Sequence, residues 1–415
     1  MRNNIAALLL VLPGISLSTD WQIGVSAAVE WAYEPEESKS QKAEVLVEPD
    51  LEVELPGDAL LSATGWFRHD ERALLDDDMD GFRLREFYVE TQLDSVFVTL
   101  GRQQIVWGKA DGIKVLDVVN PQEWREFILD DFDDSRIPLW SLNMELPWGD
   151  RNIQLIAVFE QQYHEFPETG EAYRFTSSQF VPRAPQGVPV TINATREPGR
   201  VVKDGDYGFR ISGFASGWDY SINYLYHYDD FRVFYRRVDP SHGVEIKPVY
   251  KRDHLAGASF SNAFGDLTFR AELAYRLGRH FSTSKVKDRD GVVESDEFAY
   301  VVGIDWFGLS DMFVSMQLHQ SYLLQHEQGM MRDESNTTVT ALIERDDLND
   351  TLKSRVLWLH NIDSDDGLIR PKIEYQYDDM TSLWGAADIF YGDRAGLYGQ
   401  FKDQDRFLLG LEIGV

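Results

Sequence analysis

Residues 267–277 read Leu-Thr-Phe-Arg-Ala-Glu-Leu-Ala-Tyr-Arg-Leu, and this segment predicts the fold. Apolar residues occupy every second position from Leu267 to Leu277, while polar residues such as Arg270 and Glu272 lie between them. Side chains of a β-strand point to alternate faces, so one face of this strand is apolar and the other is polar. Its length also suits a tilted strand that crosses a bilayer, which takes about 9–11 residues.

The same alternation recurs along the chain, for example at 220–228, 369–377 and 407–415. It predicts an all-β fold, a transmembrane antiparallel up-and-down β-barrel of about 18 strands, with 16 as the runner-up. The last segment alternates up to Val415, as expected of a strand that closes a barrel and removes its edge. The predicted strands start near residues 21, 43, 59, 82, 96, 138, 151, 205, 218, 251, 267, 298, 312, 336, 351, 368, 382 and 405.

A β-sandwich shows similar alternation, but the connections favour a barrel. Tight turns alternate with long acidic loops, which is typical of outer-membrane barrels and is not required in a sandwich. The short turns lie near 56–58, 94–95, 148–150, 216–217, 264–266 and 309–311, and the long loops near 34–42, 69–81, 108–137, 161–204, 231–250, 279–297 and 325–335. Tryptophans near strand ends predict interfacial anchors: Trp21, Trp31, Trp66, Trp140, Trp148, Trp218, Trp306, Trp358 and Trp384.

The first residues resemble a secretory signal. Arg2, a short apolar run from Ile5 to Leu12 and a small-x-small ending at Ser18 predict a signal peptide over 1–18, leaving 19–415 for the barrel. After residue 18 no apolar stretch is long enough for a transmembrane helix, so the mature chain is either a secreted soluble protein or a barrel. The chain has no cysteine, which excludes disulfides, thiolate metal sites and a lipid-anchored lipoprotein.

The formal net charge of −30 excludes a nucleic-acid partner. Acidic loops are instead expected to share divalent ions with outer-membrane lipid and lipopolysaccharide. The run from Asp76 to Gly81 resembles the start of a calcium loop but lacks a glutamate at the twelfth position, so we expect a solvated loop and no metal or cofactor. Predicted lumen charges have both signs, which favours a salt-bridged lumen without strong ion selectivity; they are Arg102, Arg210, Arg270, Arg276, Arg370 and Lys372, with Glu86, Glu90, Glu272 and Glu374.

Residues 101–137 differ from the rest. Asn120 as a cap, Pro121, Glu123 and an apolar face of Trp124, Phe127 and Ile128 predict a helix of about ten residues in the loop after the fifth strand. Irregular backbone cannot face lipid, so this helix must sit over the barrel or in its lumen. We expect 108–137 to be a constriction or plug; a helix that only stabilises the rim is the alternative. Deleting 121–131 should then raise the pore conductance. The candidate constriction residues are Arg102, Trp107, Lys109, Asp111, Asp117, Trp124, Arg125 and Phe127.

The run Gly101-Arg102-Gln103, Trp107-Gly108, Asp111, Asp117 and Asn120-Pro121 resembles the DUF1302 family of bacterial outer-membrane proteins, most clearly over 82–147. Barrels of this family are often encoded beside RND-type exporters and a lipid-carrier-like periplasmic protein. The resemblance implies an outer-membrane barrel of a diderm bacterium that passes or exports small hydrophobic or amphipathic compounds, with periplasmic exporter components as partners.

Two other functional classes stay open. One is a sealed structural or adhesive barrel. The other is an outer-membrane hydrolase, although the sequence has neither an HExxH nor a G-x-S-x-G motif and its nine histidines are scattered. We therefore expect a channel, with no enzymatic activity.

Overall fold

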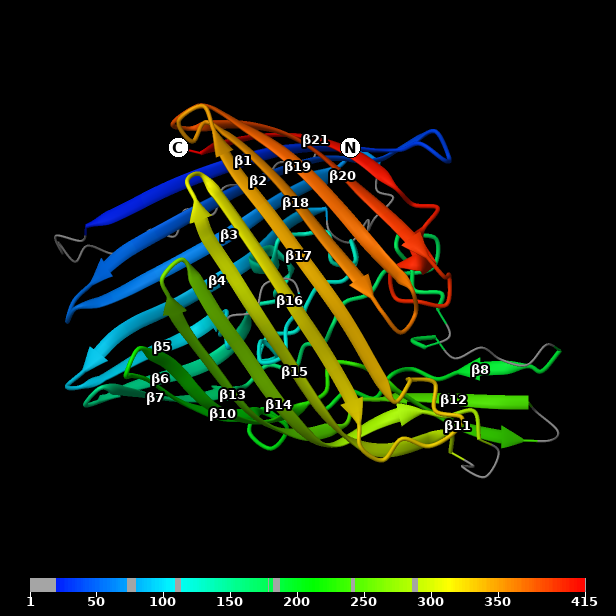
Figure 1. Cartoon of the computed structure of the whole chain (residues 1–415). Helices are drawn as coiled ribbons and strands as arrows, with labels where there is room; N and C mark the ends of the chain where they lie inside the picture. Colours follow the sequence, from blue (N-terminus) through cyan, green and yellow to red (C-terminus); the bar gives the residue numbers. More distant parts are fainter. Residues whose placement is uncertain are drawn as a thin grey trace, which may run out of the picture.

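The alternating segment at 267–277 lies within β14 (Leu267–Ser282), one of eighteen strands that form a closed antiparallel barrel in the computed structural model (Figure 1). The described residues are 20–72, 80–108, 113–177, 179–181, 187–239, 243–285 and 290–414. The other barrel strands are β1 (Trp21–Glu34), β2 (Lys39–Leu55), β3 (Ala59–Asp70), β4 (Gly81–Leu93), β5 (Val96–Gln103), β6 (Leu139–Trp148), β7 (Arg151–Val158), β9 (Asp206–Ala215), β10 (Trp218–Tyr228), β13 (Arg252–Phe264), β15 (Val292–Leu309), β16 (Met312–Leu323), β17 (Ser335–Asp347), β18 (Leu352–Asn361), β19 (Asp366–Asp378), β20 (Thr381–Gly392) and β21 (Arg406–Gly414).

The barrel closes where β21 pairs with β1, from Ser26 opposite Gly414 to Tyr33 opposite Phe407. The prediction of an all-β barrel with eighteen strands is confirmed. Two predicted starts differ most from the structure: β2 begins at Lys39 rather than 43, and β15 at Val292 rather than 298. These extensions carry polar residues on both faces, so hydrophobic alternation does not mark them.

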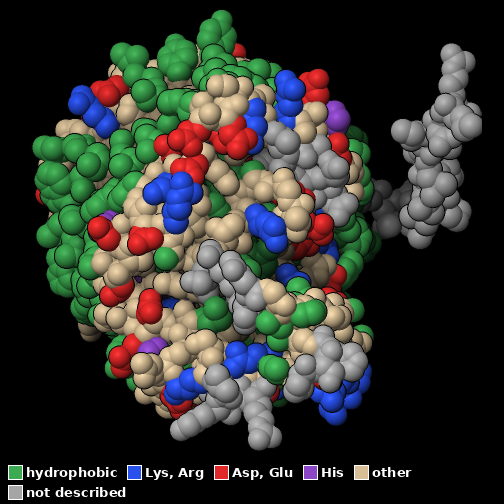
Figure 2. Space-filling view, turned by 90° about the vertical axis from the view of Figure 1, so that its right-hand side faces the viewer, with side chains coloured by type: hydrophobic (Ala, Val, Ile, Leu, Met, Phe, Trp, Pro, Cys, Tyr) green, Lys and Arg blue, Asp and Glu red, His purple; other side chains and the backbone are tan. Residues whose placement is uncertain are grey.

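The outer wall is apolar and the inner wall is polar. In β14, Leu267 is 44% exposed on the outside, whereas Glu272 is 3% exposed on the inside. Figure 2 shows apolar side chains over the barrel flank, while charged side chains gather at the loop end. Because water does not cover an apolar wall favourably, this surface suits a lipid bilayer. Among the described residues, no helix is long and apolar enough to cross a bilayer.

Connections at one end of the barrel are tight turns, as predicted. Asp58, Asp94, Ser216 and Asp311 have φ angles between 52° and 59°, the left-handed conformation that such turns require. The predicted loop at 34–42 is wrong, because β1 and β2 pair up to Glu34 and Lys39 and leave a four-residue turn. The long loops lie at the opposite end, and several of them fold into the barrel (Figure 1).

The predicted ten-residue helix is also wrong. The structure has turns at 125–128 and one short helix, α1 (Phe132–Ser135). Phe127 has a φ of 57°, which an α-helix excludes. The amide of Trp124 donates to Glu165 O at 2.7 Å instead of to a carbonyl of the predicted helix. The Asn120 side chain bonds to Ile105 and Ile137 and so does not cap a helix. The only 3-10 segment among the described strands and helices is η2 (Gly399–Phe401).

Two further corrections concern the loops and the tryptophans. The loops at 161–204 and 231–250 form a small sheet at the loop end of the barrel, made of β8 (Val190–Ile192), β11 (Val233–Asp239) and β12 (Gly243–Val249). Trp21 and Trp148 are exposed on the outer wall, as expected of anchors. Trp66 and Trp384 instead face the lumen: the Trp66 indole donates to Glu48, and Trp384 lines an inner cavity.

Candidate functional site in the barrel lumen

The loop that follows β5 enters the lumen and first lies along one wall. Trp107 is fully buried, and its indole N–H donates to Gln154 Oε1 of β7 at 2.9 Å. Leu116 is also fully buried, and its amide donates to Glu272 Oε2 of β14 at 3.2 Å. Gly208 faces the Trp107 ring so closely that a Cβ there would clash with it. The buried apolar side chains of the described part of this loop therefore pack as a hydrophobic strip against the inner faces of β6 to β15; they are Ile105, Trp107, Val115, Leu116 and Val119.

Asn120 holds the two ends of this loop together. Its Oδ1 accepts from the Ile105 amide at 2.7 Å, and its Nδ2 donates to Ile137 O at 2.9 Å. Gln122 and Arg136 form a backbone bridge next to it, and the Ile137 amide donates to Pro121 O at 2.8 Å. Residues 123–135 therefore begin and end at this paired base and project from it into the lumen; we call them the lobe.

The tip of this lobe is attached to the far wall by an ion-pair latch, made of Glu126, Lys42, Arg406 and Asp388. Glu126 contacts Lys42 Nζ at 2.6 Å and Arg406 Nη1 at 2.9 Å, and Arg406 also contacts Asp388 at 2.8 Å. Arg370 of β19 donates to Leu129 O at 2.5 Å. Since β14 and β21 are seven strands apart along the ring, the segment from Leu116 to the latch spans the interior.

The latch is buried, and its neighbouring charges decide which of its carboxyl groups is ionised. Burial alone would raise the pKa of Glu126, but Lys42 and Arg406 hold it at about 2. Burial and the neighbouring Glu126 carboxylate raise the pKa of Asp130 well above its ordinary value. Glu126 is therefore an anion between two cations, while ionisation of Asp130 beside it is disfavoured.

An aromatic cluster fills the centre of the loop end. Trp124 and Phe127 of the lobe contact Phe175 from the loop after β7, with ring centroids 6.1 and 5.9 Å away. Phe231, from the loop after β10, lies 6.3 Å from Trp124. Phe127 also packs on Phe390, Tyr398 and Phe401 from the β20–β21 region. Three long loops therefore meet inside the barrel through aromatic side chains.

His164 lies within this cluster. Its Nδ1 accepts from the Gln122 amide at 2.8 Å, and its ring is 4.8 Å from Phe231 and 5.8 Å from Trp124. Burial lowers the pKa of His164 to about 3. The imidazole is consequently neutral at physiological pH and acts as an acceptor for the lobe.

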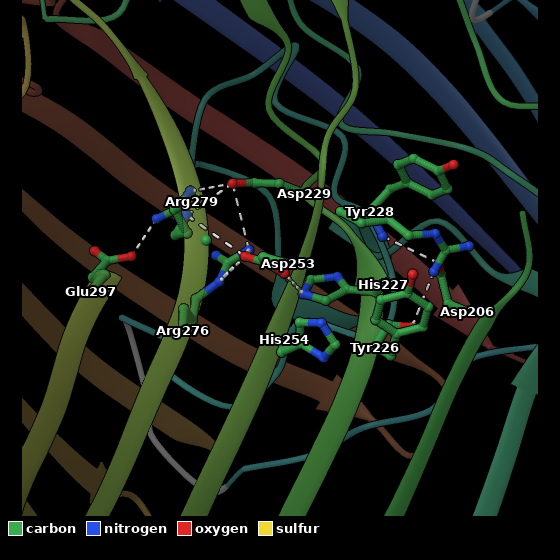
Figure 3. A network of polar contacts seen from close by, with 12 residues as sticks. Asp206, Tyr226, His227, Tyr228, Asp229, Asp253, His254, Arg276, Arg279 and Glu297 are labelled. Carbon is green, nitrogen blue, oxygen red and sulfur yellow. Dashed lines mark hydrogen bonds and ion pairs between the residues drawn. The ribbon is translucent and has the colours of Figure 1, made fainter. Parts of the chain in front are cut away.

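A second ion-pair network lies on the wall opposite the latch (Figure 3). Arg279 contacts Asp229 at 2.7 Å and also pairs with Glu297, while Arg276 contacts Asp253 at 2.5 Å. Burial would raise the pKa of Asp229, but Arg279 and Arg276 hold it below its ordinary value. His227 and Arg332 extend the network through Asp253 and Glu297.

Several predicted lumen charges are ion-paired, in agreement with a lumen of mixed sign. Arg276 and Arg370 belong to the two networks just described, and Arg270 pairs with Asp305 at 2.8 Å. Lys372 pairs with Glu374 at 2.9 Å on its own strand.

The candidate constriction residues separate into three groups. Arg102 pairs with Glu160 at 3.2 Å and, like Trp107, fixes the start of the loop to the wall. Asp117 pairs with Lys114 at 2.7 Å and Arg136 at 2.8 Å, which braces the base of the lobe. Trp124, Arg125 and Phe127 lie on the lobe itself, where Arg125 contacts Glu165 at 3.0 Å. Lys109 and Asp111 fall outside the described residues, as do the signal peptide and most of the calcium-like run at 76–81.

The latch partners and the aromatic partners were missed by sequence reasoning. Glu126 falls within the predicted helix, but its partners Lys42, Arg406 and Asp388 come from strands 84 to 280 residues away. Phe166, Phe175 and Phe231 lie in two loops that carry no periodic pattern. Their one visible signal is a high content of phenylalanine in segments that are otherwise acidic.

A cavity of about 240 Å³ lies between the lobe and strands β18 to β21, and two further cavities lie toward the opposite wall. One of about 370 Å³ lies near the loop end and is bounded by Phe231, Phe281 and Arg332. The other, of about 300 Å³, lies deeper, since its wall includes Ala274 and Thr338 nearer the middle of their strands. Both cavities touch Phe175 and Phe231, so they adjoin at the aromatic cluster.

Comparison with known proteins places this architecture among outer-membrane porin folds. OccAB1 from Acinetobacter baumannii has a TM-score of 0.57 at 10% identity, with 96% of each chain covered. The outer membrane protein OpdK and the protein OccK3 (OpdO), both from Pseudomonas aeruginosa, have TM-scores of 0.55 and 0.56 at 10% identity; they cover 95% of this chain and 99% and 96% of their own. At such identity the likeness shows the fold. No curated protein matches the sequence. Residues 57–355 match the family described as protein of unknown function (DUF1302), and the chain belongs to this family.

Proposed function

We propose that this protein is an outer-membrane channel that passes small hydrophobic or amphipathic compounds. The observation that carries the proposal is a closed barrel with an apolar outer wall and a polar inner wall, whose lumen keeps two adjoining cavities beside a folded-in loop. An eighteen-stranded barrel is wide enough to leave an aqueous path unless loops fill it. The aromatic and arginine side chains around the cavities suit solutes with an apolar part.

Residues 108–137 act in this proposal as the constriction. The lobe at 123–135 spans the interior, and the latch at Glu126 fixes its position. Trp124 and Phe127 form the apolar surface of this constriction. Arg102, Trp107 and Asp117 hold the lobe in position through their contacts with the wall and the loop base. Lys109 and Asp111 belong to the same proposal from sequence alone.

Localisation and partners follow from the same proposal. The segment 1–18 would direct export, and acidic loops would contact lipopolysaccharide through divalent ions. Family resemblance favours a role as the outer-membrane part of an RND-associated export system, with periplasmic exporter components docking at the turn end. The alternative is a sealed structural or adhesive barrel, and the fully buried aromatic residues in the lumen favour it.

Solute flux into liposomes separates these functions. Purified protein is reconstituted into liposomes loaded with a large dextran, and small amphipathic and sugar solutes of matched size are added outside. A channel admits the small solutes and swells the vesicles while retaining a large dextran. Vesicles that stay as tight as protein-free controls to every solute would support the sealed barrel.

A further inference from the structure

We propose that the loop-end cavity of about 370 Å³ is a binding site for a small amphipathic organic anion, one with a planar or branched apolar body and a carboxylate or sulfonate head. This inference rests on the proposed channel function and names the class of solute that the channel would select. Nothing in the sequence pattern predicts it, because the side chains come from three loops and two strands.

One side of this loop-end cavity, called the outer chamber below, is apolar. Phe166, Phe175, Phe231 and Phe281 line it. The ring of Phe166 contacts Phe175 and Phe231, with centroids 5.5 and 5.7 Å apart. Edge-to-face and tilted rings of this kind present both ring faces and edges to a ligand. Such a wall buries the apolar body of a solute and holds a planar one best.

The other side carries positive charge in excess. Five arginines and one carboxylate, Asp229, line the cavity among the described residues; the arginines are Arg174, Arg232, Arg276, Arg279 and Arg332. Asp229, Asp253 and Glu297 balance three of them through the network of Figure 3. Arg174 and Arg232 are exposed and have no ion pair with any residue in the described part of the chain.

The chemistry of these two groups determines the ligand class. A guanidinium presents a planar fork of donors that matches a carboxylate or sulfonate in two hydrogen bonds. A cation would be repelled, and a neutral analogue would form no ion pair with Arg174 or Arg232. A volume of about 370 Å³ is at the small end of ordinary ligand sites and accepts a bicyclic aromatic acid.

Position adds a directional argument. The chamber lies at the loop end and adjoins the deeper cavity at Phe175 and Phe231. The deeper cavity is lined by Asp229 and Asp230 as well as by Arg276 and Arg279, so its wall is closer to neutral. Asp117 and Glu297 add two further carboxylates to this wall. An anion therefore has its most favourable position in the outer chamber, before the constriction.

Calorimetry on the intact protein in neutral-lipid nanodiscs tests the site, with naphthalene-2-carboxylate as the probe and naphthalene-2-methanol as its neutral analogue. Empty nanodiscs correct for partitioning into lipid. We expect saturable binding of the acid, at least tenfold tighter than of the alcohol, and a loss of about tenfold or more in affinity in the Arg174→Gln/Arg232→Gln variant. Arg237→Gln is the matched control, since Arg237 lies exposed on β11 and does not line the chamber; its affinity should be unchanged.

This experiment distinguishes failure of the binding site from failure of the proposed channel function. The inference is overturned if the acid shows no saturable binding, if the alcohol binds equally well, or if the double variant keeps the affinity of the control. Because calorimetry needs no flux, a barrel that binds the acid but conducts no solute would refute the channel alone. A barrel that conducts without discriminating between acid and alcohol would refute the site alone.

Discussion

Replacing Glu126 by glutamine should release the lobe from the far wall. Among the residues that the structure describes, Glu126 is the one carboxylate in contact with both Lys42 and Arg406, at 2.6 and 2.9 Å, and all three side chains are buried. Glutamine has nearly the same shape, so packing is preserved while the negative charge is lost. Two cations then face a neutral amide. Asp388 remains as the partner of Arg406, and Glu30 and Glu44 remain near Lys42, at 3.1 and 3.6 Å.

The size of the effect follows from the burial of the latch. Two unit charges about 4 Å apart attract by about 4 kcal/mol at an effective dielectric constant of 20, and breaking a buried pair costs about 3–5 kcal/mol. Asp130 ionises more easily without Glu126 beside it, which offsets part of this loss. We take about 3 kcal/mol as the net destabilisation of the docked lobe. Since 1.4 kcal/mol is a factor of ten, the undocked fraction should rise about 100-fold.

Single-channel recording in a planar bilayer measures this fraction as the time spent in a higher-conductance state. Glu126→Gln should increase that time about 100-fold, and adding Asp130→Asn should increase it further because the compensating carboxylate is removed. Asp131→Asn is the control, since it changes the same charge on an exposed side chain of the same lobe. If Glu126→Gln and Asp131→Asn give the same open-state occupancy, the latch does not hold the lobe.

Three other perturbations test separate parts of the structure. The pKa of His164 is about 3 when the lobe is docked and 6.5 for a free imidazole, so the docked lobe keeps its full stability above pH 6.5 and loses it as the pH falls toward 3. At pH 5 docking should be weaker by about 2 kcal/mol, seen as a longer time in the higher-conductance state. His164→Asn should abolish this effect of acid. Trp107→Ala should lower the free energy of unfolding by about 3–5 kcal/mol through the cavity it leaves, measured by urea titration in lipid vesicles; an effect below about 1 kcal/mol would contradict the buried anchor. Met316→Arg places a charge on the exposed outer wall and should cost about 2–4 kcal/mol near the bilayer centre, whereas Gln317→Arg on the inner face should cost clearly less; equal costs would contradict the lipid-facing assignment.

The barrel could be predicted because its determinants are local. Each strand shows its two faces in its own sequence, as in 267–277, and tight turns such as Phe264-Gly265-Asp266 mark where strands end. Even strands with weak patterns, including Lys39–Leu55 and Ser335–Asp347, form where turn signals require them. Pairing in chain order then leaves one topology for an even number of strands.

The lumen could not be predicted to the same depth, because its contacts are non-local. Asn120 and Pro121 are good helix-start residues, yet the Asn120 amide forms better bonds across the loop base, and Glu165 takes the Trp124 amide. Local propensity was overruled by tertiary partners in this segment. The small sheet of β8, β11 and β12 was missed for a related reason, since its strands are only three to seven residues long and depend on pairing between two loops.

The central claim is that the lobe narrows a real pore, and single-channel conductance tests it most directly. Because Gln122 and Arg136 already pair, two glycines can replace residues 123–135 and keep the loop base and the barrel intact. We predict small conductance steps in the intact protein and larger steps in the shortened one. Equal steps in both proteins would contradict the constriction, and an absence of steps in both would contradict the channel itself.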